Sequence, residues 1–324
     1  MIDLKQAATA TLLALTPLAT AAVAEDELDL RFAGALEFAA DGTLFVGDNY
    51  QGAIFAFAMT GAAAPDRVMP VNIGDIDVKI ADRLGVPRSA VAINDMAVHP
   101  ISAEIYISVS RIGNFESAPA LIKVAQDGTI SVVDLTALPF QKQALAHFPD
   151  QDTTFRPRGL GQMPPLVRDM AKGEVTLSSL AIMDMAFYEG ELFVSGVAFD
   201  NFLSTLRRIP YPFTDVQEAA SVEMYHISHD QFETRAPIRA MTIQEVDGAP
   251  TLVAAYTCSP VVLIGLDEIV DGAKISARTI MDYGNGQPID MLTYSLNGAE
   301  TLFLTSNSRS PHIIPVESLS GARA

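Results

Sequence analysis

The feature that most constrains this chain is a pair of short apolar segments that recurs five times. In each pair a polar residue stands at the start of the first apolar run, and the second run follows about eight to ten residues later. Short apolar runs separated by turn residues are typical of β-strands. A unit of two or more such strands repeated along a chain predicts a β-propeller, in which each unit is one blade. The pairs are 36–38 with 44–46, 94–98 with 105–107, 183–187 with 192–194, 239–243 with 252–254, and 289–292 with 302–304.

We therefore expect an all-β fold, a single propeller of five recognisable blades, with six or seven left open. The first blade is the clearest, because Asp41-Gly42 supplies a tight turn between its first two strands. Arg67–Ile73 is the expected fourth strand of that blade. The last blade has no fourth strand before the C-terminus, so we expect Leu28–Phe32 to supply it and close the ring. Closure would remove exposed strand edges.

Two stretches do not fit the repeat and are treated as insertions near 74–90 and 136–178. The first contains Val78–Leu84, which is expected to form a turn or two of helix. The second is long and lacks alternation, and a loop of that length is usually functional or a misread element. It therefore leaves a sixth blade open. Both insertions are candidates for lids over the channel mouth or for decoration of the rim.

The N-terminus has the pattern of a secretory signal peptide. A weakly basic head is followed by apolar residues and by Ala22-Val23-Ala24, an A-x-A cleavage signal. We expect cleavage after Ala24, which leaves 25–324 as one propeller domain in the periplasm or secreted medium. No later run is apolar and long enough to span a bilayer.

The charge balance limits the classes of partner that the chain is expected to bind. The formal net charge is −18, which disfavours nucleic acid and anionic membranes and favours cations. Cys258 is the single cysteine, so an internal disulfide is excluded. The expected partners are a small-molecule ligand or substrate and, as an alternative, a periplasmic protein.

Polar residues at the strand starts are expected to meet on the propeller axis. The first strand of each blade lines the central channel, so residues far apart in sequence converge there. Carboxylates gathered in this way repel one another unless a cation or protons neutralise them. Their oxygens suit Ca²⁺, and the alternative is that they cap strand ends and brace the fold. The residues are Glu37, Asn94, Asp95, Asp184, Arg239 and Asp290.

Three of these strand starts resemble motifs of a known superfamily. Glu37 lies in GALEFAADGTLFVGD, Asn94-Asp95 in INDMAVHP and Asp290 in PIDMLTY. They look like the inner-strand motifs of calcium-dependent propeller hydrolases, the gluconolactonase, regucalcin and paraoxonase-like families. Similar motifs also occur in NHL-like and six-bladed TolB-like propellers, some of them non-enzymatic.

The resemblance implies a site and an activity. It implies one Ca²⁺ on the axis, held by Glu37, Asn94, Asp184 and Asp290, and hydrolysis of a small lactone or ester. The metal would act as a Lewis acid on the substrate oxygen. Asp95 or Asp184 would be the general base, and Arg239 would steady the developing oxyanion.

Two other hypotheses stay open. One is a non-catalytic propeller that binds a ligand or a protein at the same channel mouth. The other is a copper or redox-related protein that uses Cys258 with His312, since thiolate and imidazole are soft-metal ligands. The bland alternative for Cys258 is a buried thiol that packs as a small hydrophobe.

Overall fold

The computed structural model describes most of the chain between residues 27 and 321. The described ranges are 27–59, 63–113, 116–150, 152–155, 168–169, 174–198, 203–226, 230–233, 236–257, 260–283, 287–307 and 310–321. The expected signal peptide, 1–24, lies outside them, and so does Cys258. Among the described helices, none has the length and apolar character needed to cross a membrane.

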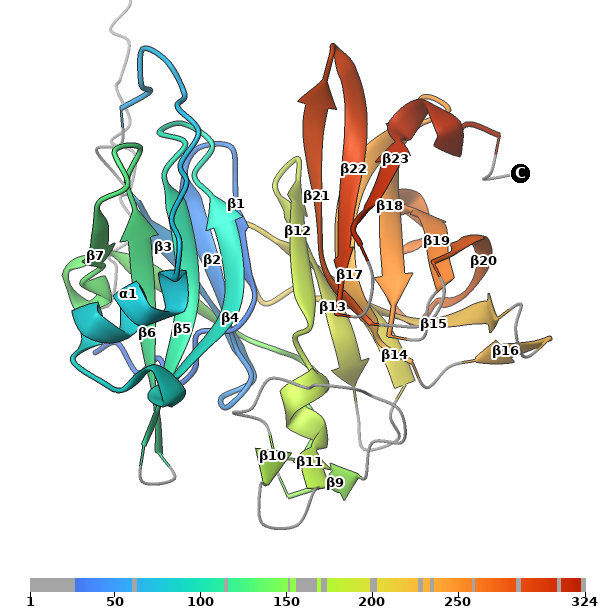
Figure 1. Cartoon of the computed structure of the whole chain (residues 1–324). Helices are drawn as coiled ribbons and strands as arrows, with labels where there is room; N and C mark the ends of the chain where they lie inside the picture. Colours follow the sequence, from blue (N-terminus) through green and yellow to red (C-terminus); the bar gives the residue numbers. More distant parts are fainter. Residues whose placement is uncertain are drawn as a thin grey trace, which may run out of the picture.

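The fold is an all-β propeller of five antiparallel blades, as predicted (Figure 1). Within each blade the strands run from the axis outward, so the first strand of each lines the centre. Blade 1 consists of β1 (Leu36–Phe38), β2 (Thr43–Asp48), β3 (Ala53–Ala58) and β8 (Phe140–Ala144). Blade 2 consists of β4 (Val91–Val98), β5 (Ile105–Gly113), β6 (Glu116–Val124) and β7 (Ile130–Val132). Blade 3 consists of β12 (Asp184–Tyr188), β13 (Glu191–Ala198), β14 (Leu203–Pro210) and β15 (Glu218–His226). Blade 4 consists of β17 (Ile238–Val246), β18 (Ala249–Tyr256), β19 (Pro260–Gly265) and β20 (Lys274–Asp282). Blade 5 consists of β21 (Pro288–Leu296), β22 (Ala299–Ser306) and β23 (His312–Pro315).

Blade 2 is inserted into blade 1. The outer strand of blade 1 is β8, which follows the whole of blade 2 in sequence and pairs antiparallel with β3. The expected fourth strand, Arg67–Ile73, is wrong, because this segment forms no strand and is largely exposed. It contains Pro70, whereas Phe140 on β8 brings its ring against the rings of Phe55 and Phe57. Burial of these aromatic rings favours β8 at that edge.

The blades follow one another around the axis in the order 2, 1, 3, 4, 5. The inner strand β1 contacts both β4 and β12, β12 contacts β17, and β17 contacts β21. Each neighbouring pair of blades shares a buried apolar cluster, with Phe57 and Tyr106 between blades 1 and 2, for example, and Met241 and Phe193 between blades 3 and 4. The core therefore lies between blades rather than at one centre.

The buried clusters of the described residues include none between blades 5 and 2. Apolar side chains on the two facing inner strands stay exposed, with Met96 and Val98 of β4 at 43% and 52% and Leu292 of β21 at 39%. The predicted closing strand, Leu28–Phe32, is wrong. Its residues form no strand, and Leu28 and Leu30 pack on the cluster between blades 1 and 2.

The insertions fold as small elements. The helix predicted near 78–84 is α1 (Ile76–Leu84), which packs on the outside of blade 2 through Ile80. The longer insertion contains β8, three very short strands that form their own sheet, and the 3-10 turn η4 (Leu177–Leu180), and its described residues build no sixth blade. The short strands are β9 (Thr154–Phe155), β10 (Arg168–Asp169) and β11 (Glu174–Thr176). The remaining elements are β16 (Gln231–Glu233), η1 (Arg88–Ala90), η2 (Leu135–Ala137), η5 (Leu266–Glu268) and η6 (Val316–Leu319).

Candidate ligand site on the propeller axis

An Asp-Met pair lies at the same register of the inner strand in three blades. The Met of each pair lies opposite an apolar residue of the second strand, as Met96 does opposite Ile107 and Met185 opposite Val194. Because these strands are arranged around one axis, the register places the three preceding carboxylates at one level of the channel. The pairs are Asp95-Met96, Asp184-Met185 and Asp290-Met291.

Two of the aspartates join their own blade to the next one. Asp95 Oδ1 accepts a hydrogen bond from the Met96 amide (2.8 Å), and its Oδ2 accepts one from Leu36 of blade 1 (2.7 Å). Asp184 repeats the arrangement, with bonds from its own neighbour Met185 (2.8 Å) and from Met241 of blade 4 (2.6 Å). Each carboxylate thus accepts from two backbone amides, one on each side of a blade boundary.

Glu37 and Asp290 complete the set of four. Glu37 Oε1 accepts from the Phe187 amide of blade 3 (3.1 Å) and so bridges blades 1 and 3. Asp290 accepts from the Met291 amide (2.7 Å), and its own amide donates to Thr305 Oγ1 (3.1 Å). Within the described residues, Asp290 makes no hydrogen bond to an amide of another blade.

Burial and mutual repulsion favour protons on these carboxyl groups. Burial raises the pKa of Glu37 to about 8, and the negative charges of Asp95 and Asp290 add to the rise. Burial and the nearby Asp290 raise the pKa of Asp95 to about 7. The pKa of Asp184 is raised well above its usual value by burial, Asp95 and Asp290, and burial also raises the pKa of Asp290. The site therefore changes its charge near neutral pH.

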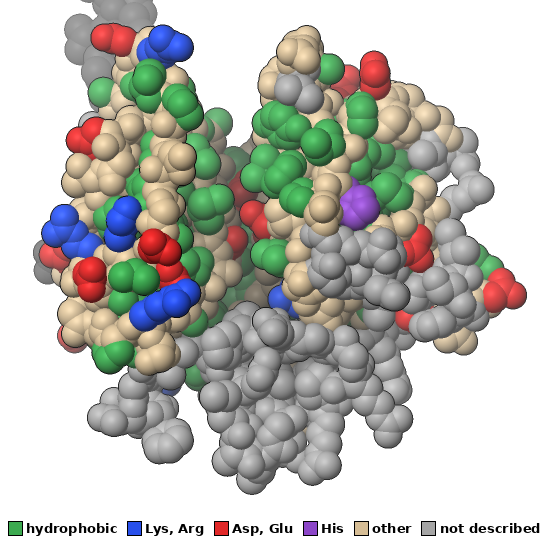
Figure 2. Space-filling view, viewed as in Figure 1, with side chains coloured by type: hydrophobic (Ala, Val, Ile, Leu, Met, Phe, Trp, Pro, Cys, Tyr) green, Lys and Arg blue, Asp and Glu red, His purple; other side chains and the backbone are tan. Residues whose placement is uncertain are grey.

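The four carboxylates line a cavity of about 400 Å³ on the axis. Figure 2 shows acidic side chains in the hollow between the two halves of the molecule. The rest of the cavity wall is largely apolar and comes from all five inner strands. Among the described residues, those that line the cavity include no Lys, Arg or His. The apolar lining includes Phe38, Met96, Val98, Phe187, Ile243 and Leu292.

Two predicted site residues lie elsewhere. Arg239 is not among the residues that line the cavity; it lies at an irregularity in the pairing of β17 with β18, and its guanidinium donates to Gln287. The residue at the Asp position of blade 4 is therefore Ala240. Asn94 also sits at an irregularity, and its amide nitrogen donates to the Ala33 carbonyl (2.7 Å) and to Ser110 Oγ (2.8 Å).

A second-strand signal went unnoticed in the sequence. Wherever the inner strand carries the aspartate, the residue opposite it on the second strand has a hydroxyl, as Ser195 does opposite Asp184. In blades 1 and 4 the corresponding residues are Ala35 and Ala240, and the residues opposite them on the second strand are Gly47 and Ala255. Aligning the blades on their Met or Leu would have shown this pattern. The hydroxyl partners of Asp95 and Asp290 are Ser108 and Thr305.

Metal binding stays a prediction. Within the described residues, no group of three or more Asp, Glu, His or Cys side chains has the arrangement needed to hold a metal ion. The donors on the axis are all carboxylate oxygens, which is the chemistry that Ca²⁺ prefers. For the copper hypothesis, His312 lies on β23 with its Nε2 buried and without a hydrogen-bond partner, whereas Cys258 is outside the described residues.

Neither a protein-family model nor a curated protein sequence matches the chain. Among solved structures it is similar to a glucose dehydrogenase, with a TM-score of 0.32 and 11% identity over 88% of this chain and 96% of that one. It is also similar to the allergen Mala s 1 of Malassezia sympodialis, with a TM-score of 0.32 and 8% identity over 88% and 92% of the two chains. Virginiamycin B lyase from Staphylococcus aureus gives 0.29 and 10%, over 88% and 84%. Scores this low assign no activity, and the fold described above rests on the strand pairing.

Proposed function

We propose that the chain is a ligand-binding propeller whose axial cavity takes a small organic cation. The observation that supports this most directly is the composition of the cavity wall. Four carboxylates from four blades face one space, and no basic side chain is among the described residues that line it. A buried carboxylate without a nearby cation keeps a proton or attracts a positive charge.

The apolar part of the cavity wall favours an organic cation. Met96, Val98 and Leu292 expose apolar surface between β4 and β21, and Phe38 and Phe187 also line the cavity. An ammonium compound with an apolar body would place its charge among the carboxylates and bury its body against these side chains. Such a combination of an apolar wall with a few polar groups is typical of small-molecule sites.

The first experiment is calorimetric titration of the chain with n-butylammonium, with n-butanol as the uncharged control. We expect binding of the ammonium and none of the alcohol. The affinity should rise between a pH of about 6 and about 9, because the carboxyl groups lose their protons in that range and become available to the cation.

Variants identify the cavity as the place of binding. Asp290→Asn should weaken ammonium binding at least about tenfold, since it removes one charge from the wall. It is a mild substitution, because Asp290 bonds to no amide of another blade within the described residues. The matched control is Asp127→Asn, on the exposed turn after β6. Absence of ammonium binding at every pH, or equal losses in the two variants, would contradict the proposal.

A second candidate is calcium-dependent hydrolysis of a small lactone or ester. The oxygen-only donor set of Glu37, Asp184 and Asp290 in one cavity favours it, together with the resemblance of the strand starts. In that function Ca²⁺ would polarise the substrate oxygen when bound. Asp95 lines the same cavity, and it would take a proton there with a pKa that burial and Asp290 raise to about 7.

Elemental analysis and a melting curve before and after EDTA test this candidate. One equivalent of calcium, a lower Tm without it and turnover of a lactone or ester would support it. Binding of n-butylammonium to metal-free protein, with no turnover and no calcium, would support organic-cation binding and contradict calcium-dependent hydrolysis.

A further inference from the structure

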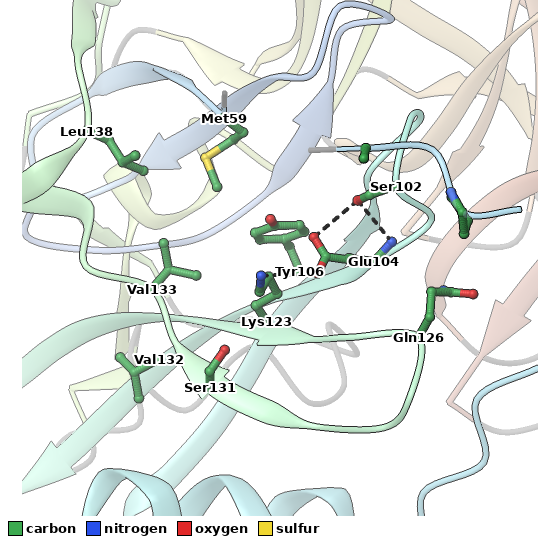
Figure 3. Close-up of a pocket in the computed structure, with 12 residues that line it drawn as sticks. Met59, Ser102, Glu104, Tyr106, Lys123, Gln126, Ser131, Val132, Val133 and Leu138 are labelled. Atoms are coloured by element: carbon green, nitrogen blue, oxygen red, sulfur yellow. Dashed lines mark hydrogen bonds and ion pairs between the residues drawn. The ribbon is translucent and has the colours of Figure 1, made fainter. Parts of the chain in front are cut away.

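The insertion of blade 2 into blade 1 creates a second cavity, which shares no lining residue with the axial one. Two chain crossovers connect the blades: one leaves β3 at Met59, and the other returns through Val133 and Leu138 to β8. They lie against each other, since the Ala58 amide donates to the Pro139 carbonyl (3.1 Å). Between them and blade 2 is a cavity of about 550 Å³, here called the crossover pocket (Figure 3).

One end of the crossover pocket is polar and carries one charge of each sign. Lys123 Nζ lies 3.1 Å from Glu104 Oε1, and Ser102 Oγ donates to Glu104 Oε2 (3.1 Å). Burial and the neighbouring Glu104 carboxylate raise the pKa of Tyr106 to about 12, so its hydroxyl remains a donor. Gln126 adds an amide that is held by Ala103 and Met69.

The other end is apolar. Met59, Val133 and Leu138 line it in Figure 3, and Val132 beside them is 47% exposed. The pocket thus offers a charged end and an aliphatic end within one space. Its volume is in the range usual for small-molecule sites.

The charges select the class of ligand. A simple anion that approached Lys123 would also meet Glu104, and a simple cation would meet Lys123, so each would suffer repulsion. A zwitterion avoids both costs, because its ammonium faces Glu104 while its carboxylate faces Lys123. We propose that the crossover pocket binds a free α-amino acid with an aliphatic side chain, which packs against Met59, Val133 and Leu138.

The test is calorimetric titration with L-leucine of the full chain carrying Asp290→Asn at a pH of about 6, where the axial cavity is expected to bind ammonium compounds weakly. Two analogues each lack one charge: 3-methylbutylamine has no carboxylate, and 4-methylpentanoate has no ammonium. We expect L-leucine to bind at least about tenfold more tightly than either, which is the usual effect of losing one charge-assisted hydrogen bond. Equal binding of all three, or no binding of L-leucine, would overturn the proposal.

Variants then locate the site. Glu104→Gln and Lys123→Gln should each weaken L-leucine binding about tenfold or more. The control is Glu191→Gln, which removes a comparable ion pair to Arg208 (2.6 Å) on blade 3. It should leave L-leucine binding unchanged.

The double reversal Glu104→Lys with Lys123→Glu restores one charge of each sign and should recover part of the affinity. Melting curves of each variant separate a folding defect from a binding defect. A loss of L-leucine binding in Glu191→Gln equal to that in Glu104→Gln would overturn the assignment. Asp290→Asn, which alters the axial cavity, should keep L-leucine binding, so failure of either site is recognised separately.

Discussion

At the scale of single residues, Glu37 combines a structural bond with an unfavourable charge. Its carboxylate accepts from Phe187 across a blade boundary, yet burial and two neighbouring aspartates raise its pKa to about 8. Between the usual glutamate pKa and this value, the unfolded chain has released a proton that the folded chain still holds. The free energy of unfolding therefore falls as pH rises through that window, and the loss is complete above the folded pKa.

Glu37→Gln should remove this loss, since glutamine still offers an oxygen to the Phe187 amide and carries no charge. We expect the variant to melt at least about 2 °C higher than the wild type at a pH of about 8.5, with little difference near pH 4.5. Melting curves across this range provide the measurement. Asp127→Asn is a control of opposite sign. A bond from the Thr129 amide lowers the pKa of Asp127, so this variant should not melt higher than the wild type at high pH. A Glu37→Gln variant that is less stable at high pH would show that the charge is stabilising.

The site could be predicted from the sequence only in part, and the errors also arise at this scale. Glu37, Asp95, Asp184 and Asp290 were found because a polar residue before an apolar strand is visible locally. Arg239 was placed on the axis because an irregularity in β17 moves the register by one residue, and nothing in the local pattern reveals such an irregularity. The apolar walls of the cavity were missed, since exposed and buried apolar residues look alike in a sequence.

At the scale of elements, Gly196 on β13 shows how closely the long insertion is seated on blade 3. A Cβ at Gly196 would lie 2.2 Å from the Ala181 carbonyl oxygen, just after η4. That same oxygen accepts from Arg207 Nη1 (3.1 Å), a guanidinium buried in blade 3. The backbone at 181 therefore has little room to move without breaking a buried hydrogen bond.

Gly196→Ala should consequently destabilise the chain by about 1–3 kcal/mol, the usual cost of forcing atoms into a packed interior. Urea unfolding of the variant measures it. Gly74→Ala is a matched control, because a Cβ there meets nothing within 4 Å. Equal stability of the two variants would contradict the close contact.

The strands themselves were largely predictable, whereas their partners were not always. The strand pairs that begin each blade follow from alternation and from turns such as Asp41-Gly42. The outer strand of blade 1 could not be found in this way. It lies beyond all of blade 2 in the chain, and its place is decided by the contact of Phe140 with Phe55 and Phe57 rather than by sequence proximity.

At the scale of the whole molecule, the five blades are joined in unequal ways. Blades 1 and 2 share their chain, since β3 and β8 enclose blade 2 in sequence. Blades 3 and 4 share a sheet, because β15 pairs in parallel with β20 and makes their outer strands continuous. Blade 5 joins blade 4 through the contact of β17 with β21 and a buried cluster.

The parallel pairing of β15 with β20 has a mechanical consequence. Blades 3 and 4 are joined at their rim, and blades 1 and 2 are joined by their interleaved chain. The molecule therefore has two halves, one made of blades 1 and 2 and the other of blades 3, 4 and 5. The two halves meet at the boundary between blades 1 and 3, which a buried apolar cluster and the reciprocal bonds of Asn49 with Ile182 hold together, whereas β4 and β21 line the axial cavity. Glu37 spans that boundary through its bond to Phe187, so a carboxyl group whose pKa is raised by burial also links the two halves.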